Sequence, residues 1–427
     1  MAEPTGQTGQ GAHLDPSFTR ALRVMGLASF AAMASMRWCD AMLPALARDF
    51  SSTSGQAAGV VSAFALAYGV LQLVYGPLGD RIGKQRMVAI ATLACTIGAV
   101  ASALAPSLGW LTVARALSGA TAAGIVPTTM AWIGDRVSYE HRQTVLARLL
   151  LATITGMIAG QWLGGVFADT LGWRVGFFVV AVVFAIAGGA LQWSLRGMVA
   201  SAAGGAGPAS DAPAPSYLST VRAVLGYPEA RRLMFVAAVE GALAFAAVAF
   251  VPSHLHARFG LSMAAAGGVV ALYGLGGLVY ARSVGWLLRR LGQLPMARAG
   301  GLVLGTAWLL LAWVPDWRWA PLLCLVAGLG FYMLHNVLQT HATQVVPAAR
   351  GTAVSMFASA LFLGQSIGVT AMSWVVDHWS AAVALSVCGP GLMAVGLYFA
   401  AASAAAARPE AHRVDAPQST SDGGAPR

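Results

Sequence analysis

The feature that most constrains this chain is a succession of long apolar runs with almost no charge. Only 10% of its 427 residues are charged and 57% are hydrophobic, whereas a soluble protein carries about 25% charged residues. A helix that crosses a bilayer needs about 20 apolar residues. The sequence therefore predicts an all-α membrane protein with twelve transmembrane helices, near 21–44, 55–77, 87–105, 109–133, 144–168, 174–195, 232–252, 263–285, 295–315, 319–343, 352–376 and 380–403.

The apolar runs form two groups of six, which predict two helical bundles at 21–195 and 231–403. Between them, 196–230 is expected to be a cytoplasmic linker, because it is rich in Ala, Gly, Pro and Ser and poor in large apolar side chains. A short surface helix is expected in its second part. The polar segments 1–20 and 404–427 are expected to be cytoplasmic tails, the second of them disordered.

The basic residues indicate the orientation of the helices, because Lys and Arg gather in cytoplasmic loops. With the N-terminus in the cytoplasm, nineteen of the 26 basic residues fall near cytoplasmic helix ends and four in outer loops. Both termini are therefore expected in the cytoplasm. Lys84 is the sole Lys, and such Arg usage is typical of a GC-rich bacterium, so the bacterial cytoplasmic membrane is the predicted location. The net charge of +10 is scattered between apolar runs, which argues against nucleic acid as a partner.

The sequence shows no pattern expected of an enzyme or an ATP-driven pump. Its four cysteines each fall in a different apolar run, without metal-ligand or disulfide spacing. It has no nucleophile motif and no phosphate-binding loop with Lys. We therefore expect no metal, no cofactor and no enzymatic activity. A membrane sensor without transport stays an alternative that no motif supports.

The two halves repeat each other at an offset of 208 residues. The matching pairs are Arg142 with Arg350, Thr144 with Thr352, Gly156 with Gly364, Gly160 with Gly368, Asp169 with Asp377, and Pro44 with Pro252. Five of these pairs lie in one stretch, which indicates a duplication. Parallel repeats of this kind place the substrate path between the halves.

The most specific string lies between the second and third spans and reads GPLGDRIGKQR, from Gly76 to Arg86. It resembles the signature loop of the major facilitator superfamily, and the resemblance extends over all twelve spans. The resemblance implies a gating loop formed by Gly76, Gly79, Asp80, Arg81, Gly83 and Arg86. It also implies that Asp80, with Arg81 and Arg86 as partners, joins the two halves in the outward-open state. In the second-half copy of this loop, Arg289 stands in place of the acidic residue.

Two further motifs resemble those of the same superfamily. The string Arg115-Ala116-Leu117-Ser118-Gly119 resembles its fourth-helix motif, which implies a role for Arg115 in proton coupling. In the fifth span, glycines recur at spacings of four, which lets a neighbouring backbone approach closely. This pattern resembles the motif of the antiporter branch, although Gln161 stands where that motif has Pro; the glycines are Gly156, Gly160, Gly164 and Gly165.

Of the sixteen acidic residues, only Asp40 and Glu240 lie well inside a predicted span. Asp40 is expected to pair either with Arg37, at i,i+3 on the same helix, or with Arg115. Glu240 is at a depth that permits a pair with His335. An apolar surrounding favours the neutral form of a carboxyl group and a nearby cation favours the charged form, so such pairs suit proton loading and release. Static ion pairs that hold helices together are the alternative.

These features favour a secondary transporter that exports a small molecule by alternating access, coupled to protons. Uptake by a symporter or facilitator of the same fold stays open because of Gln161. The expected partners are a small-molecule substrate, protons and membrane lipid, with the chain acting as a monomer. Polar and aromatic residues on cavity-facing helices are the candidates for substrate contact: Tyr68, Gln72, Gln161, Trp162, Tyr273, Asn336, Gln339 and Gln365.

Overall fold

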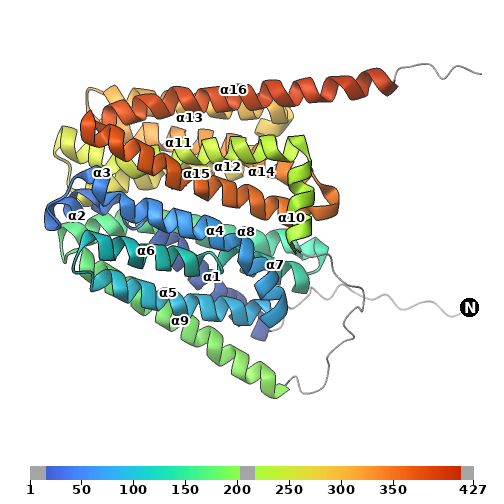
Figure 1. The fold of residues 1–427 in the computed structure, drawn as a ribbon, viewed down its shortest axis with the longest axis horizontal. Coiled ribbons are helices and arrows are strands. Elements are labelled where there is room, and N and C mark those ends of the chain that lie inside the picture. The colour runs from blue at the N-terminus through green and yellow to red at the C-terminus, as the bar shows by residue number, and fades with distance from the viewer. Residues whose placement is uncertain (1–15, 202–216, 415–427) are drawn as a thin grey trace, which may run out of the picture.

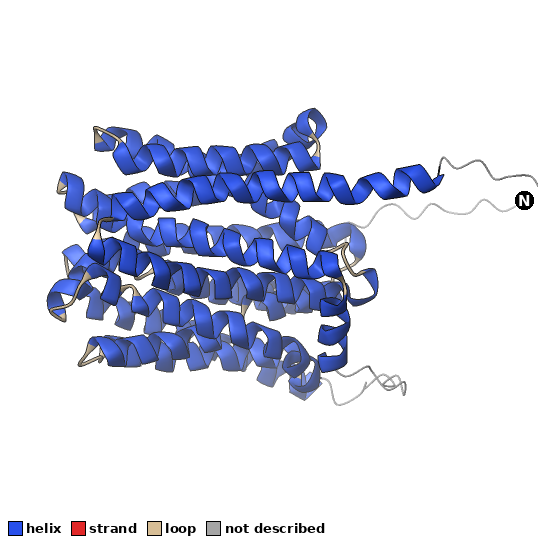
Figure 2. Cartoon of the chain, turned by 45° about the horizontal axis from the view of Figure 1, so that its top comes forward, coloured by secondary structure: helices blue, strands red, loops and turns tan. Residues whose placement is uncertain are grey.

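The apolar runs form helices because a bilayer leaves backbone polar groups no partner except those within the helix itself. The computed structural model describes residues 16–201 and 217–414, and within these ranges it consists of helices and short connections, without strands (Figure 2). The first half comprises α1 (Pro16–Arg37), η1 (Asp40–Met42), α2 (Leu43–Asp49), α3 (Ser54–Ala57), α4 (Gly59–Ile82), α5 (Lys84–Ala103), α6 (Leu108–Ala122), α7 (Val126–Arg136), α8 (Tyr139–Asp169) and α9 (Trp173–Ser201).

A short helix, α10 (Tyr217–Gly226), precedes the second half. In Figure 1, α10 lies across one end of the molecule, where α7 and the end of α16 are also found, while α2 and α3 lie at the opposite end. We refer to these as the α10 end and the α3 end. The second half comprises α11 (Pro228–Phe259), α12 (Met263–Leu291), α13 (Gln293–Trp313), η2 (Trp317–Trp319), α14 (Ala320–Ala342), η3 (Pro347–Ala349), α15 (Arg350–His378) and α16 (Ala381–Val414).

The predicted fold of twelve spans in two six-helix halves is confirmed. Eleven helical segments of the described chain are long and apolar enough to cross a membrane, with α3 and α4, and likewise α6 and α7, each counted as one segment. The remaining span is α1, whose 22 residues include Arg20, Arg23 and Arg37. These three charges lower its hydropathy. The protein is thus a multi-pass membrane protein.

Two spans that the sequence predicts as continuous are interrupted in the structure. The first span breaks at Trp38 and Cys39, so that Asp40 lies at the start of the 3-10 turn η1 rather than inside a helix. The fourth span breaks between α6 and α7 at Gly124. In each case a proline, Pro44 or Pro127, stands in the first turn of the helix that follows, where its missing N–H costs nothing.

Predicted boundaries also differ at the ends of the halves. Helix α1 begins at Pro16 rather than at residue 21, and α9 continues to Ser201, beyond the predicted end at 195. Helix α16 continues to Val414, although disorder was expected from 404. The run of Ala at this point favours the helical state. The rest of the predicted linker and tails, at 1–15, 202–216 and 415–427, lies outside the described residues.

The predicted glycine packing joins α8 to α1, and the repeat of the sequence reproduces it in the second half. A Cβ atom placed on Gly156 or Gly160 of α8 would collide with backbone carbonyl oxygens of α1, and one placed on Gly364 or Gly368 of α15 would collide with those of α11. The partner residues repeat at the same offset as the glycines, which confirms that the two halves are related. The contacts are Gly156 on Phe30, Gly160 on Ala34, Gly164 on Trp38, Gly364 on Ala238 and Gly368 on Ala242. Gly165 instead contacts Met263 of α12, in the other half.

Replacement of Gly160 or Gly368 by alanine is therefore expected to destabilise the protein. The added methyl group must push two helix backbones apart, and such overpacking costs about 1–3 kcal/mol. Thermal unfolding in detergent measures the effect. Gly189→Ala in α9 is the matched control, because no atom lies within 4 Å of its added Cβ. Equal unfolding temperatures for all three variants would show that these close contacts do not limit stability.

Candidate transport site

A buried charged cluster lies where the first span breaks. The Asp40 carboxylate forms an ion pair with Arg37, with 3.5 Å between Oδ2 and Nη1, and accepts a hydrogen bond of 2.9 Å from Nε2 of Gln161 in α8. The Asp40 and Arg37 side chains are 0% and 1% exposed. The break in the helix turns Asp40 toward α8. Oδ1 of Asp40 and Oε1 of Gln161 have no hydrogen-bond partner among the described residues.

This cluster lies at the boundary between the two halves. The Arg37 guanidinium packs 4.3 Å from the centroid of the Phe245 ring in α11. Arg37, Gln161 and Tyr273 of α12 also line a void of about 10 Å³, which is room for about one water molecule. The cluster is therefore closed to any larger solute in this conformation.

Arg115 does not pair directly with Asp40, which decides between the two partners predicted for that carboxylate. Its guanidinium donates hydrogen bonds to Oγ and to the carbonyl oxygen of Ser35 in α1, at 3.2 and 2.8 Å. It also packs 4.4 Å from the centroid of the Phe64 ring in α4. Arg115 is fully buried and joins three helices of the first half. Its electrostatic interaction with Asp40 acts over a longer distance.

The second half contains its own buried carboxylate with a basic partner, as the sequence predicts. Oε2 of Glu240 in α11 lies 3.1 Å from Nδ1 of His335 in α14. The imidazole stacks on Phe331, with ring centroids 5.0 Å apart. Glu240 is fully buried, whereas the His335 side chain is 14% exposed. The pair is thus reachable only from the side of the histidine.

His335 faces a cavity of about 530 Å³ between α8 of the first half and α12 to α14 of the second. Two of the predicted substrate contacts, Asn336 and Gln339, line this cavity as well. The remaining polar lining consists of Gln293, Thr340, Tyr280 and Tyr332. No Lys, Arg, Asp or Glu belongs to the described lining. Ile154 of α8 lines this cavity, and Ile158, one helical turn further along α8, lines the void beside Arg37. The cavity therefore lies one turn closer to the α10 end than the void does.

The other predicted substrate contacts lie outside this cavity. Tyr68 packs against Phe362 of α15, with ring centroids 4.5 Å apart, in the closed contact between α4 and α15. Gln72 and Gln365 are 6% and 1% exposed. Trp162 is 51% exposed and lies beside Gly268, so its contact with substrate stays a prediction. Gln161 and Trp162 are neighbours in sequence and point to different faces of α8.

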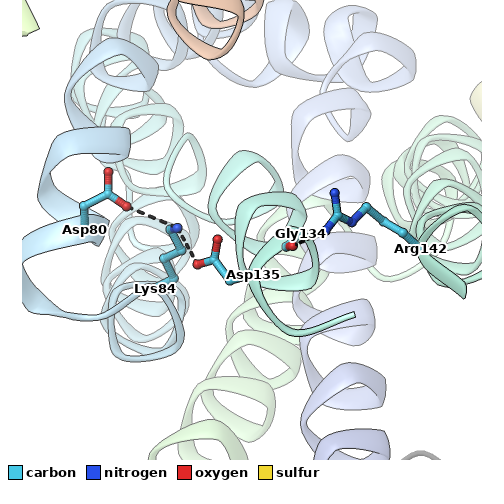
Figure 3. Close-up of polar contacts among 5 residues, drawn as sticks. All are labelled: Asp80, Lys84, Gly134, Asp135 and Arg142. Atoms are coloured by element: carbon cyan, nitrogen blue, oxygen red, sulfur yellow. Dashed lines mark hydrogen bonds and ion pairs between the residues drawn. The ribbon is translucent and has the colours of Figure 1, made fainter. Parts of the chain in front are cut away.

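The predicted gating loop is mostly helical and its carboxylate stays within the first half. Helix α4 continues to Ile82 and α5 begins at Lys84, so only Gly83 lies between them. Oδ1 of Asp80 lies 3.2 Å from Nζ of Lys84, which also pairs with Asp135 of α7 (Figure 3). Arg81 and Arg86, the partners expected for Asp80, form no ion pair with the described residues. The Asp80 side chain is 67% exposed.

The glycines of this loop have different structural roles. Gly83 has a φ of +91°, which L-residues with a Cβ rarely adopt. Gly79 lies close to α7, where an added Cβ would be 3.3 Å from Cγ2 of Thr128. Open space surrounds Gly76. In the second half, Gly292 has a φ of +76° at the corresponding turn, so the turn is kept although its carboxylate is replaced by Arg289.

Two six-helix halves that enclose buried charges and a cavity define a membrane protein of the transporter class. The chain belongs to the Major Facilitator Superfamily, whose pattern it matches over residues 25–369. It is 24% identical over 336 residues to the MFS-type transporter YceJ of Bacillus subtilis, a match that covers 77% of this chain and 82% of YceJ.

Shorter matches include proteins named as efflux pumps. The multi-drug resistance efflux pump PmrA of Streptococcus pneumoniae is 29% identical over 163 residues, 37% of this chain and 41% of PmrA. The efflux pump dotC of Dothistroma septosporum is 31% identical over 163 residues, 36% of this chain and 26% of dotC. Both matches thus span less than half of either protein.

Solved structures share the fold at low sequence identity. A crystal structure of a mutant of the nucleoside transporter NupG matches with a TM-score of 0.73 at 13% identity, over 89% of this chain and 99% of that one. A bacterial homologue of the lysosomal transporter Spinster, in an inward-facing conformation, matches with a TM-score of 0.68 at 17% identity, over 91% and 96% of the two chains.

Proposed function

We propose that this protein exports a small molecule by alternating access, in exchange for protons. The observation that carries the proposal is the pair of buried carboxylates, Asp40 and Glu240, each held by a basic side chain next to the path between the halves. Ionisable groups inside a membrane protein are costly and mark ion or substrate pathways. The efflux pumps among the shorter matches support export as the direction.

The two carboxylates differ in access, as proton exchange requires. Glu240 is connected through His335 to the 530 Å³ cavity, whereas the Asp40 cluster is closed. When the halves change their relative tilt, the closed site opens and the open site closes. A proton that binds at one carboxylate on one side of the membrane must then pass to the other carboxylate, from which it is released on the opposite side.

The proposed orientation places the α10 end in the cytoplasm of a bacterial cell, with the protein in the cytoplasmic membrane as a monomer. The excess of basic residues at this end supports the placement. The cavity then faces the cytoplasm and receives the substrate there. Its lining of amides, hydroxyls and two tyrosines suits a solute that forms hydrogen bonds, bound from the cytoplasmic side.

Inverted membrane vesicles distinguish export from uptake, because their lumen corresponds to the outside of the cell. A thermal-shift screen of the purified protein against sugars, amino acids, organic anions and cationic drugs first supplies a ligand. For a proton-coupled exporter, an acidic lumen is expected to drive this ligand into the vesicles. One pH unit provides about 1.4 kcal/mol per proton, which supports about tenfold accumulation for one-to-one exchange.

Two results would contradict the proposal. Loss of ligand from preloaded vesicles under an acidic lumen would identify an uptake symporter. Equilibration that ignores the pH gradient would identify a facilitator. Vesicles without the protein, and vesicles treated with a protonophore, provide the baselines.

A further inference from the structure

At the α3 end, a carboxylate at the last residue of α8 reaches across to the second half. Oδ2 of Asp169 accepts a hydrogen bond of 2.7 Å from the backbone N–H of Ala264, in the first turn of α12. The first N–H groups of a helix have no partner within the helix, and they carry partial positive charge. Asp169 therefore caps a helix that belongs to the other half of the molecule.

The second half makes the reciprocal contact. Asp377, near the end of α15, accepts a hydrogen bond of 2.9 Å from the backbone N–H of Gly55 in α3. Its other oxygen accepts a bond of 2.6 Å from the hydroxyl of Thr53. Gly55 is suited to this contact, since a Cβ atom there would collide with Asp377. Helix α3 continues into α4 as a single span of 29 residues.

Asp169 and Asp377 are equivalent residues of the repeat, and neither forms an ion pair with the described residues. We infer that these two contacts, which we call the carboxylate clasps, are a gate that holds the halves together at the α3 end. The inference extends the proposed function, because it rests on alternating access and assigns residues to one of its steps. The α3 end can open only if both clasps break, whereas proton exchange need not involve them.

At the opposite end of the molecule, the two corresponding positions of the repeat do not both carry a carboxylate. There the first half offers Asp80, and the corresponding position of the second half is Arg289, which cannot accept a hydrogen bond. The two equivalent positions compared at the α3 end thus both carry a carboxylate, whereas only one of the two compared at the α10 end does. This asymmetry favours the conformation in which the α3 end is closed, and both clasps are formed in this structure.

Two of the three clasp hydrogen bonds are exposed to solvent and the third is partly buried. Each clasp therefore has the modest strength of a helix cap, for which replacement by alanine shifts an equilibrium about fivefold. We expect Asp169→Ala and Asp377→Ala each to raise the ratio of outward-open to inward-open protein about fivefold, and the double variant about 25-fold. Double electron–electron resonance measures this ratio between spin labels on Leu104→Cys and Arg318→Cys. The four native cysteines are buried and do not compete for the label.

Asp49→Ala is the matched control. Asp49 is also a carboxylate at the α3 end, but it accepts its hydrogen bonds from Trp173 and Arg174 of its own half. Without ligand and at constant pH, the Asp49→Ala variant should have the same distribution of distances between the two spin labels as the protein without this substitution. A double clasp variant that unfolds at the normal temperature and keeps the distances of the unmodified protein would overturn the inference. Because this readout needs neither transport nor a proton gradient, failure of the proposed function would not affect it.

Discussion

Asp40→Asn is expected to abolish the pH dependence of transport and to destabilise the protein by about 3–5 kcal/mol, the cost of leaving one charge of a buried pair without its partner. The charge left behind is Arg37, which is 1% exposed and packs on the Phe245 ring. Asparagine keeps the shape of the side chain and the bond to Gln161, but it cannot bind and release a proton. Thermal unfolding and transport across a range of pH measure the two effects.

The double variant Arg37→Gln/Asp40→Asn separates coupling from structural support. It removes both charges, so most of the lost stability should return. The pH dependence of transport should not return, because no titratable group replaces the carboxylate. If the double variant transported with the pH dependence of the unmodified protein, Asp40 and Arg37 would be a static ion pair and not part of the proton path.

Glu240→Gln is expected to reduce substrate accumulation about tenfold for each pH unit of the applied gradient. Each proton that moves with a gradient of one pH unit contributes about 1.4 kcal/mol, and this variant removes one proton site. Glutamine keeps the length of the side chain and a hydrogen bond to His335, so binding of the substrate should change little. Substrate accumulation in vesicles, measured at several pH gradients, gives the change in accumulation per pH unit. Thermal shift measures the affinity of the variant for the substrate.

Glu229→Gln is the control for this prediction. Glu229 belongs to the same helix, α11, but it lies in the first turn, where it pairs with Arg232 at 3.7 Å. Its replacement should leave the slope of accumulation unchanged. A Glu240→Gln variant with the slope of the unmodified protein would show that the Glu240–His335 pair serves only to hold α11 against α14.

Much of the architecture followed from patterns that depend only on local sequence. Apolar runs and their lengths predict the spans, because a bilayer selects for them regardless of neighbouring helices. The offset of 208 residues predicts the equivalent glycine contacts of α8 and α15. The contact of Glu240 with His335 followed from their similar depth in the membrane, and the pair of Arg37 with Asp40 from their spacing.

The remaining features depend on how helices are rotated and broken, which no single run of sequence specifies. Gln161 was expected to contact substrate, but in the structure it donates a hydrogen bond to Asp40. Asp135, the partner of Lys84, was not predicted, because it lies 51 residues away on a helix of its own. The break at Trp38 and Cys39 was also missed. Pro44, in the first turn of the helix that follows, is the sequence signal for that break.

The glycine contacts between α1 and α8, and between α11 and α15, also have a mechanical consequence. Helices in backbone-to-backbone contact have little room to slide past each other, so we expect each half to move as a rigid body. The 31 residues of α8 extend about 46 Å at 1.5 Å per residue, so a rotation of about 10° around the middle moves each end by about 4 Å. A displacement of that size breaks any hydrogen bond at the end of the helix, while groups near the middle of the helix move much less. Gln161, which donates a hydrogen bond to Asp40, lies seven residues from the middle of α8, so the same rotation moves it by about 2 Å, less than half as far as the helix ends. A change of one proton at the buried charges can therefore be coupled to a larger opening at the ends of the helices.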